Sequence, residues 1–543
     1  MPFCVALAAG LLFGAGCTRV SEQASRNSAH PGTIPGELRV GFYESLDNLN
    51  PLLSLQSYVG EVELLIFSGL VTYDDHYRLV PDVATDVPTL RNGGISADGL
   101  TITYHLRHGV LFSDGAPLTS ADVAYTWQQL ENPDNNAPNR EPAERVRTIE
   151  TPDPYTVVVR LKAPYSPFVS SFLRNGYTPA GGILPKHLLG GYSDLNHAQY
   201  NLKPVGSGPF VVESWEPGLK LTLAANARYW RGAPKLKRIV ISIIPDENSL
   251  LFALRAHDID FDYNVPESQY DQLKGLDGIR VSVEPSFSLE HIKFNCGRAP
   301  LSDVRVRQAI AYAIDWSGMA RRIYRGLGVQ GMADVRPDSW AYNPAVVPYP
   351  YDPARARGLL RQAGWAPGAD GVLSKDGRAL ALKMITVVGA PVRLKAEELV
   401  QQDLKAIGVE VDVHNYPANL VFATFANNGV LTRGNYDLAL VTMDLDQDPD
   451  NSINLSPDQL PPRGQNRSFF VDEQVGHWEA AAERTYDPAL RRHYYMLVQQ
   501  RVHDALPFHG IVWRPSINAY SENMSGYRPG AANDFWNSYD WSI

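Results

Sequence analysis

The stretch PVRLKAEELVQQDLKAIGVEVDV, residues 391–413, contains a helix and a strand in direct succession. The helix predicted over residues 391–407 ends at Gly408, because glycine readily adopts the backbone conformation that stops a helix. Valines alternate through residues 409–413 and predict a strand, and the all-apolar run at residues 438–441 is typical of a strand buried on both faces. Helices that alternate with such strands imply a parallel or mixed α/β sheet.

The length and composition of the chain limit what it can be. Its 543 residues are more than one hydrophobic core usually supports, so we expect at least two lobes. Hydrophobic residues make up 44% and charged residues 20%, which is the profile of an ordinary soluble globular protein. The formal net charge of −10 provides no basic surface to neutralise phosphates, and this excludes nucleic acid as the expected partner.

Residues before Pro285 follow a pattern richer in strands. Short runs that favour strands lie at residues 38–42, 102–106, 156–161, 219–223 and 239–244. Thr119 is predicted to cap a helix, because Asp122 stands three residues on in the capping-box position. Helices return after Pro285, and Ser302 is predicted to cap the first of them. We therefore expect an α/β second lobe and antiparallel strands within residues 81–204.

The chain begins with an apolar run over residues 3–16 that ends at Cys17. The run is too short to span a bilayer as a helix but suits the core of a secretion signal. Small residues directly precede Cys17, which resembles the lipobox of bacterial lipoproteins. We predict a lipoprotein signal over residues 1–17, lipidation of Cys17 and a flexible tether over residues 18–36. A plain signal peptide cut nearby is the alternative.

Motifs of catalysis are missing from the sequence. It contains no G-x-S-x-G, H-E-x-x-H, C-x-x-C or Walker A pattern, and its thirteen histidines are scattered. Cys296 is expected to be a small buried hydrophobic residue rather than a nucleophile. We therefore predict that the protein is not an enzyme and that it carries no cofactor and no metal ion.

Six separated blocks resemble one known family. They are FSGLV at residues 67–71, LTITYHLRHGVLFSDGAPLTSADVAYTW at 100–127, VGSGPF at 205–210, residues 226–230, DVRVRQAIAYAID at 303–315 and residues 352–365. In this order they resemble the solute-binding proteins of peptide/nickel ABC importers, which include the periplasmic oligopeptide- and dipeptide-binding proteins. The resemblance runs from about Leu38 to the C-terminus.

The resemblance implies an α/β, two-lobed periplasmic-binding-protein-like fold with an extra β-rich subdomain inserted in the first lobe. The predicted parts are lobe 1 at residues 37–80, 205–288 and 514–543, the inserted subdomain at 81–204, and lobe 2 at 289–513. The crossover that follows residue 513 is expected near Pro515.

The same resemblance implies a substrate-binding lipoprotein of an ABC importer. It would capture a peptide or peptide-sized solute between its lobes and deliver it to the transmembrane subunits of a permease. We expect a monomer in the cell envelope, in the periplasm or on the outer face of the cytoplasmic membrane and held there by its lipid. A secreted hydrolase and a sensory binding protein for a non-peptide solute are the alternatives.

Four aspartates follow the predicted strand at residues 438–441, namely Asp444, Asp446, Asp448 and Asp450. A calcium loop is a poor match, because Pro449 stands where such a loop needs glycine and Leu455 where it needs a chelating glutamate. A solvated turn is a second interpretation.

The resemblance gives a third interpretation, in which this acidic run lines the cleft. Peptide-binding relatives pair an aspartate of this segment with the α-ammonium of the ligand. Leu445 holds the corresponding position here, between Asp444 and Asp446. We predict a cationic ligand group that faces Asp444 or Asp446, with Asp448 as a further ligand-binding residue.

The resemblance also places candidates on the first-lobe side of the cleft. Asn50, Gln56 and Tyr58 follow the first strand and are predicted to contact the ligand. Ordinary loop capping by the polar side chains is the alternative. Asn295, just past the first crossover, has the same two interpretations.

Two further candidates belong to the second lobe and its return crossover. Arg393 is the nearest candidate partner for a ligand carboxylate, and an exposed arginine on a helix surface is the alternative. Trp513 is predicted to form the floor of the cleft, and a core tryptophan is the alternative.

Overall fold

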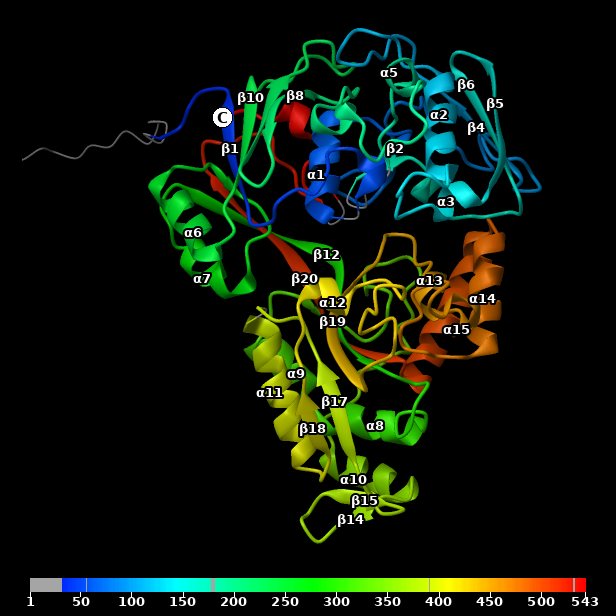
Figure 1. The fold of residues 1–543 in the computed structure, drawn as a ribbon, viewed down its shortest axis with the longest axis vertical. Coiled ribbons are helices and arrows are strands. Elements are labelled where there is room, and N and C mark those ends of the chain that lie inside the picture. The colour runs from blue at the N-terminus through cyan, green and yellow to red at the C-terminus, as the bar shows by residue number, and fades with distance from the viewer. Residues whose placement is uncertain (1–31, 55, 177–180, 390, 531–532) are drawn as a thin grey trace, which may run out of the picture.

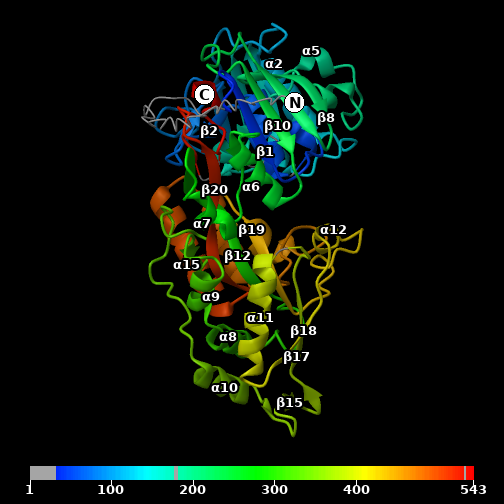
Figure 2. The ribbon, with the colours of Figure 1, turned by 90° about the vertical axis from the view of Figure 1, so that its left-hand side faces the viewer.

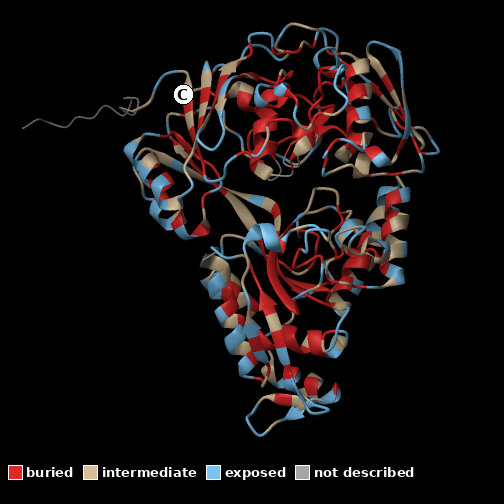
Figure 3. Cartoon of the chain, in the orientation of Figure 1, coloured by how far each residue is buried: buried red, intermediate tan, exposed pale blue. Residues whose placement is uncertain are grey.

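The computed structural model describes residues 32–54, 56–176, 181–389, 391–530 and 533–543. It consists of two lobes, one above the other, joined by two long strands (Figure 1). Each lobe has its own buried core (Figure 3). The two-lobed α/β fold expected from the sequence is therefore confirmed. Cys17 and residues 18–31 of the predicted tether lie outside the described residues.

One mixed sheet of eleven strands runs through both lobes. Its order is β18-β17-β19-β12-β20-β11-β1-β10-β9-β8, and β13 pairs with β20. The strands are β1 Glu37–Phe42, β8 Phe210–Glu216, β9 Lys220–Ala225, β10 Arg238–Ile243, β11 Phe261–Asp262, β12 Ile279–Phe294, β13 Val329–Gln330, β17 Ala381–Ile385, β18 Glu410–Val413, β19 Leu438–Asp444 and β20 Phe508–Ser521.

Strands β12 and β20 connect the lobes as an antiparallel pair (Figure 2). Their register shifts between Pro285, which faces Pro515, and Leu289, which faces Trp513. Proline has no backbone N–H to give to the ladder, so the pairing is loosened where the chain passes from one lobe to the other. The predicted crossovers at 288/289 and 513/514 lie beside this irregularity.

The upper lobe joins the first part of the sheet to a region of smaller strands and helices. Helices α1 Ser57–Ile66, α6 Glu247–Ala256 and α7 Tyr270–Leu273 accompany strands β11, β1, β10, β9 and β8. The chain between α1 and β8 adds β2 Val71–Tyr73, β3 Leu79–Pro81, β4 Thr101–His105, β5 Val146–Asp153, β6 Thr156–Leu161, β7 Arg174–Asn175, α2 Ser120–Glu131, α3 Glu141–Glu144, α4 Phe168–Ser171 and α5 Lys186–Leu189. The predicted Thr119 capping box is confirmed, with the Thr119 N–H donating to Asp122 at 2.9 Å.

The lower lobe is the α/β part of the molecule. Strand β17 pairs in parallel with β18 and β19, and the smaller strands are β14 Ala366–Pro367, β15 Leu373–Lys375 and β16 Arg378–Ala379. The helices are α8 Val304–Ala313, α9 Trp316–Arg322, α10 Pro353–Gln362, α11 Pro391–Lys405, α12 Ala418–Val421, α13 Ser452–Leu455, α14 Glu473–Arg484 and α15 Pro488–Ala505. The predicted α11–β18 succession is confirmed.

One local prediction in this lobe is wrong. Helix α8 is capped by Asp303 and not by Ser302, because the Asp303 carboxylate accepts the N–H of Arg305 at 2.9 Å. None of the helices in the described part of the chain is both long enough and apolar enough to cross a membrane.

Candidate functional site

Three acidic side chains of the upper lobe come together at one edge of the sheet. Strands β10, β1 and β11 are parallel neighbours, so their carboxyl ends lie at the same edge. Glu44 follows β1, Glu247 begins the helix after β10, and Asp262 ends β11. All three line a cavity between the lobes with a volume of about 900 Å³. We call these three residues the acidic edge.

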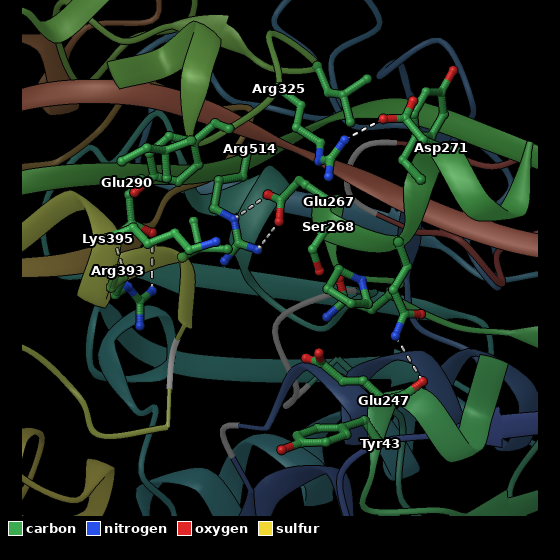
Figure 4. A pocket seen from close by; sticks show the side chains of 18 of the residues that line it. Tyr43, Glu247, Glu267, Ser268, Asp271, Glu290, Arg325, Arg393, Lys395 and Arg514 are labelled. Atoms are coloured by element: carbon green, nitrogen blue, oxygen red, sulfur yellow. Dashed lines mark hydrogen bonds and ion pairs between the residues drawn. The ribbon is translucent and has the colours of Figure 1, made fainter. Parts of the chain in front are cut away.

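The opposite wall of the cavity is rich in cations. Helix α11 contributes Arg393 and Lys395, helix α9 contributes Arg321, and the crossing strand β20 contributes Arg514. Figure 4 shows Arg393, Lys395 and Arg514 across the cavity from Glu247. The cavity thus has a basic side and an acidic side.

Two of these arginines are held by buried carboxylates of the protein. The Arg393 guanidinium donates to both oxygens of Glu290, at 2.7 and 3.2 Å, and Arg514 donates to both oxygens of Glu267, at 2.8 and 2.9 Å. Burial raises the pKa of Glu290, but the adjacent Arg393 brings that pKa below its ordinary value. Both pairs are therefore part of the framework of the cavity.

The acidic edge has the opposite electrostatic character. Burial and, to a smaller extent, the neighbouring charge of Glu247 raise the pKa of Asp262 to about 7. Burial also raises the pKa of Glu44. The pKa of the Tyr58 hydroxyl rises first through burial and then through Glu44. Negative charge at this edge is therefore disfavoured while no cation is present.

Two polar atoms of the cavity wall are buried without a partner among the described residues. They are the Tyr324 hydroxyl and the Gln269 Oε1. A buried polar group without a hydrogen bond costs roughly 1–3 kcal/mol, so such atoms favour a polar ligand or water in the cavity.

Two of the residues predicted from the sequence, Tyr58 and Arg393, line this cavity. The side chain of Asn50 accepts the Leu52 N–H at 3.1 Å and donates to Asn201 at 3.0 Å, and Gln56 accepts the Asp47 N–H at 3.1 Å. These bonds are the loop capping considered as the alternative. Contact of Asn50 or Gln56 with a ligand stays a prediction.

Asn295 and Trp513 make contacts within the protein. The Asn295 amide donates to the carbonyls of Gly434 and Tyr436, at 3.0 and 2.9 Å. Trp513 is 3% exposed and packs in a core cluster with Leu289. Neither residue is among those that line the cavity.

The acidic run is bonded to other parts of the protein. Asp444 accepts the Ser288 hydroxyl at 2.5 Å, Asp446 pairs with Arg174 at 2.5 Å, Asp448 with Arg491 at 2.8 Å, and Asp450 accepts the Tyr165 hydroxyl at 3.2 Å. Arg174 and Tyr165 belong to the upper lobe, so the run connects the lobes. Across the ranges that the structure describes, no group of three or more His, Cys, Asp or Glu residues is suited to hold a metal ion.

The sequence had pointed to Tyr58 but not to the acidic edge. One signal was present, because Glu44 and Glu247 follow the two runs predicted as strands at residues 38–42 and 239–244. Polar residues directly after parallel strands are candidates for a binding site. Asp262 gave no such signal, since β11 is only two residues long.

The chain matches a family model described as bacterial extracellular solute-binding proteins, family 5 Middle, over residues 78–459. It is 26% identical to the oligopeptide-binding protein AppA of Bacillus subtilis over 530 residues, which are 96% of this chain and 94% of AppA. It is 27% identical to the glutathione-binding protein GsiB of Salmonella typhimurium over 514 residues, 93% of this chain and 94% of GsiB.

The structure is similar to that of NikZ from Campylobacter jejuni in complex with Ni(L-His). The TM-score is 0.81 at 26% identity, and the match covers 94% of this chain and 100% of NikZ. The same arrangement of lobes is therefore found in a protein whose solved structure holds a small ligand.

Proposed function

Because the chain belongs to the bacterial extracellular solute-binding proteins, family 5, we propose that it captures a peptide or peptide-sized solute between its lobes and delivers it to the permease of an ABC importer. The family drawn from the sequence blocks is thereby confirmed. Beyond the family, we propose the class of solute, its delivery to a permease and the lipid anchor. AppA is an oligopeptide-binding protein and GsiB a glutathione-binding protein, which favours a peptide-like solute.

The observation that carries the proposal is the cavity of about 900 Å³ lined by residues of both lobes. This volume lies in the range typical of sites that enclose small ligands. Carboxylates on one wall and cations on the other suit a zwitterion, and a short peptide is one. The Tyr324 hydroxyl and the Gln269 oxygen, which lack a partner among the described residues, are further polar atoms of the cavity wall.

The proposed mechanism breaks no bond. The solute enters while the lobes are apart, the lobes close by a hinge motion, and the closed form docks on the permease. The register shift of β12 and β20 beside Pro285 and Pro515 supports a hinge at this point, because fewer backbone bonds resist bending there.

Protein purified under native conditions is expected to carry a solute that mass spectrometry of the denatured sample identifies as peptide-sized. Adding this solute back to stripped protein is expected to lower the radius of gyration in small-angle scattering, because the lobes close around it. An unchanged radius at saturation contradicts the proposal. Turnover of chromogenic peptides or esters would instead support the alternative of a secreted hydrolase. A pull-down that captures a receptor but no permease would support the alternative of a sensory binding protein.

We also propose a lipid anchor on Cys17. The mature protein is expected to partition into detergent and to carry a diacylglyceryl mass on Cys17, because small residues and an apolar run precede this residue. Intact-mass measurement of the exported protein tests this, with Cys17→Ser as the control that lacks the modification. A soluble product that begins after residue 17 contradicts it.

A further inference from the structure

We infer that the acidic edge, Glu44, Glu247 and Asp262, binds a cationic group of the solute, either a primary ammonium or a guanidinium. The inference rests on the proposed function, since it takes the interlobe cavity to be the place of the solute. It goes further by assigning the charge of one part of the solute and the wall that recognises it.

Asp262 is the central observation. Its side chain lines the cavity, yet the residue is only 2% exposed. Within the described ranges its carboxylate forms neither a hydrogen bond nor an ion pair, and its ionisation is opposed by burial and by the charge of Glu247. A buried carboxylate without a partner is strongly unfavourable. The protein therefore keeps in this wall an acceptor that a ligand can satisfy.

The groups around Asp262 do not supply the missing cation. Glu247 approaches from α6, Glu44 from the segment after β1, and the Tyr58 hydroxyl from α1, beside the Asn264 amide. The cation that acts on Glu247 is Arg514. The Nε and Nη2 of that guanidinium donate to Glu267, at 2.8 and 2.9 Å. Arg514 therefore acts on Glu247 at a distance only, and no cation of the described residues acts on Asp262.

Aromatic side chains complete a site suited to a cation. The ring of Tyr58 packs edge-on against Tyr263, with 5.1 Å between centroids, beside Asp262. Tyr43 lies next to Glu247 on the same wall (Figure 4). A cation over an aromatic face is attracted by the ring, and carboxylates beside it add hydrogen-bond acceptors.

The acidic run after β19 is less suited to the same task. Asp446 and Asp448 already pair with Arg174 and Arg491, at 2.5 and 2.8 Å. A ligand cation there would have to compete with an arginine that is in place. At Asp262 it meets no such competitor.

Protonation gives the inference a second signature. Because the pKa of Asp262 is about 7 in the ligand-free cavity, the carboxyl holds a proton for part of the time at neutral pH. A bound cation favours the carboxylate, so binding is expected to release protons at pH 6.5 and to strengthen as the pH rises towards 8. Glu44, Glu247 and Tyr58 are the titratable groups of this wall near Asp262, and among them the charge of Glu247 opposes its ionisation in the empty site.

The test uses four probes on wild-type protein, Asp262→Asn and the control Asp258→Asn, which changes an exposed aspartate four residues away. The probes are a mixture of uncharged-side-chain tripeptides with free amino termini, the same mixture N-acetylated, an acetylated mixture with one lysine or arginine, and spermidine. Native mass spectrometry gives the affinities, and calorimetry in two buffers gives the protons released.

We expect wild-type protein to prefer at least one cationic probe over the neutral acetylated mixture by about ten- to a hundredfold, the range of a charge-assisted hydrogen bond. Asp262→Asn is expected to lose this preference and the proton release, while Asp258→Asn keeps both. The cationic probe that binds best shows whether the site recognises an amino terminus, a basic side chain or a polyamine.

If Asp262→Asn binds every probe as wild-type protein does, the inference is overturned and the proposed function stands. If wild-type protein binds none of the four probes, the proposed function fails as well. Thermal unfolding of Asp262→Asn without ligand tests whether Asp262 has a structural role instead. If it has none, loss of its unpaired buried carboxylate is expected to stabilise the empty protein. Should Asp262→Asn not fold, Glu247→Gln on the more exposed helix start is expected to reduce the same preference severalfold.

Discussion

Replacing Glu290 by glutamine is expected to lower the free energy of unfolding by about 3–5 kcal/mol, because it leaves the charge of Arg393 buried without its carboxylate partner. Glu290 is 1% exposed and the Arg393 side chain 16% exposed. The two side chains meet through two hydrogen bonds, and the Thr442 hydroxyl donates to Glu290 at 3.0 Å. Urea unfolding followed by circular dichroism measures the effect.

A matched control is Glu150→Gln, which breaks the pair that Glu150 forms with Arg160 at the same distance of 2.7 Å. Both of these side chains are about half exposed, so solvent already screens the pair and a far smaller change is expected. Equal effects of the two substitutions would contradict the assigned role of burial.

The same pair gives a pH dependence with a definite sign. Because Arg393 holds the pKa of Glu290 below its ordinary value, the pair stabilises the folded protein fully above that ordinary value. Its contribution is lost as the pH falls through the acidic range in which the folded form takes up the proton. In Glu290→Gln this part of the acid destabilisation is expected to be absent.

Elements with strong local signals were predictable from the sequence. Helix α11 and strand β18 follow from the residues between Pro391 and Val413, because an amphipathic helix, a glycine stop and alternating valines stand in succession. The cap of α8 was misplaced by one residue, since Ser302 and Asp303 are both good caps. Asp303 also pairs with Arg305 at 2.7 Å, a contact that composition alone does not reveal.

The acidic edge was not predictable in the same way. Its members come from segments about 200 residues apart, and they meet only because β10, β1 and β11 are neighbours in the sheet. Strand β11 is too short to show any alternation. The family resemblance gave the two lobes but not the order of strands at this edge, so Asp262 stayed unnoticed.

The run from Asp444 to Asp450 shows the converse difficulty. Four acidic residues in seven positions are conspicuous in the sequence, and the expected partner was a cation of the ligand. Arg174, which binds Asp446, lies on β7, far earlier in the chain. Arg491, which binds Asp448, lies on helix α15. Whether an aspartate is paired within the protein depends on tertiary contacts, which the run itself does not encode.

Asp446→Asn is expected to weaken binding of the identified solute by about ten- to a hundredfold, as the loss of one charge-assisted hydrogen bond implies. Two mechanisms predict this result. Asp446 could bind a cation of the solute, as the sequence suggested. Alternatively, its pair with Arg174 holds the closed form together, because Arg174 lies on β7 of the upper lobe and Asp446 follows β19 of the lower lobe.

A double-mutant cycle with Arg174→Met separates the two mechanisms, because methionine keeps much of the side-chain volume and removes the charge. If the pair acts by closing the lobes, each single substitution weakens binding and the double variant is hardly weaker than either. If Asp446 binds the solute, the losses add. We expect the first result, since the Arg174 guanidinium lies 2.5 Å from the Asp446 carboxylate, and calorimetry on the four proteins decides. Additive losses would restore Asp446 as a ligand-binding residue and place a second cation of the solute at the acidic run.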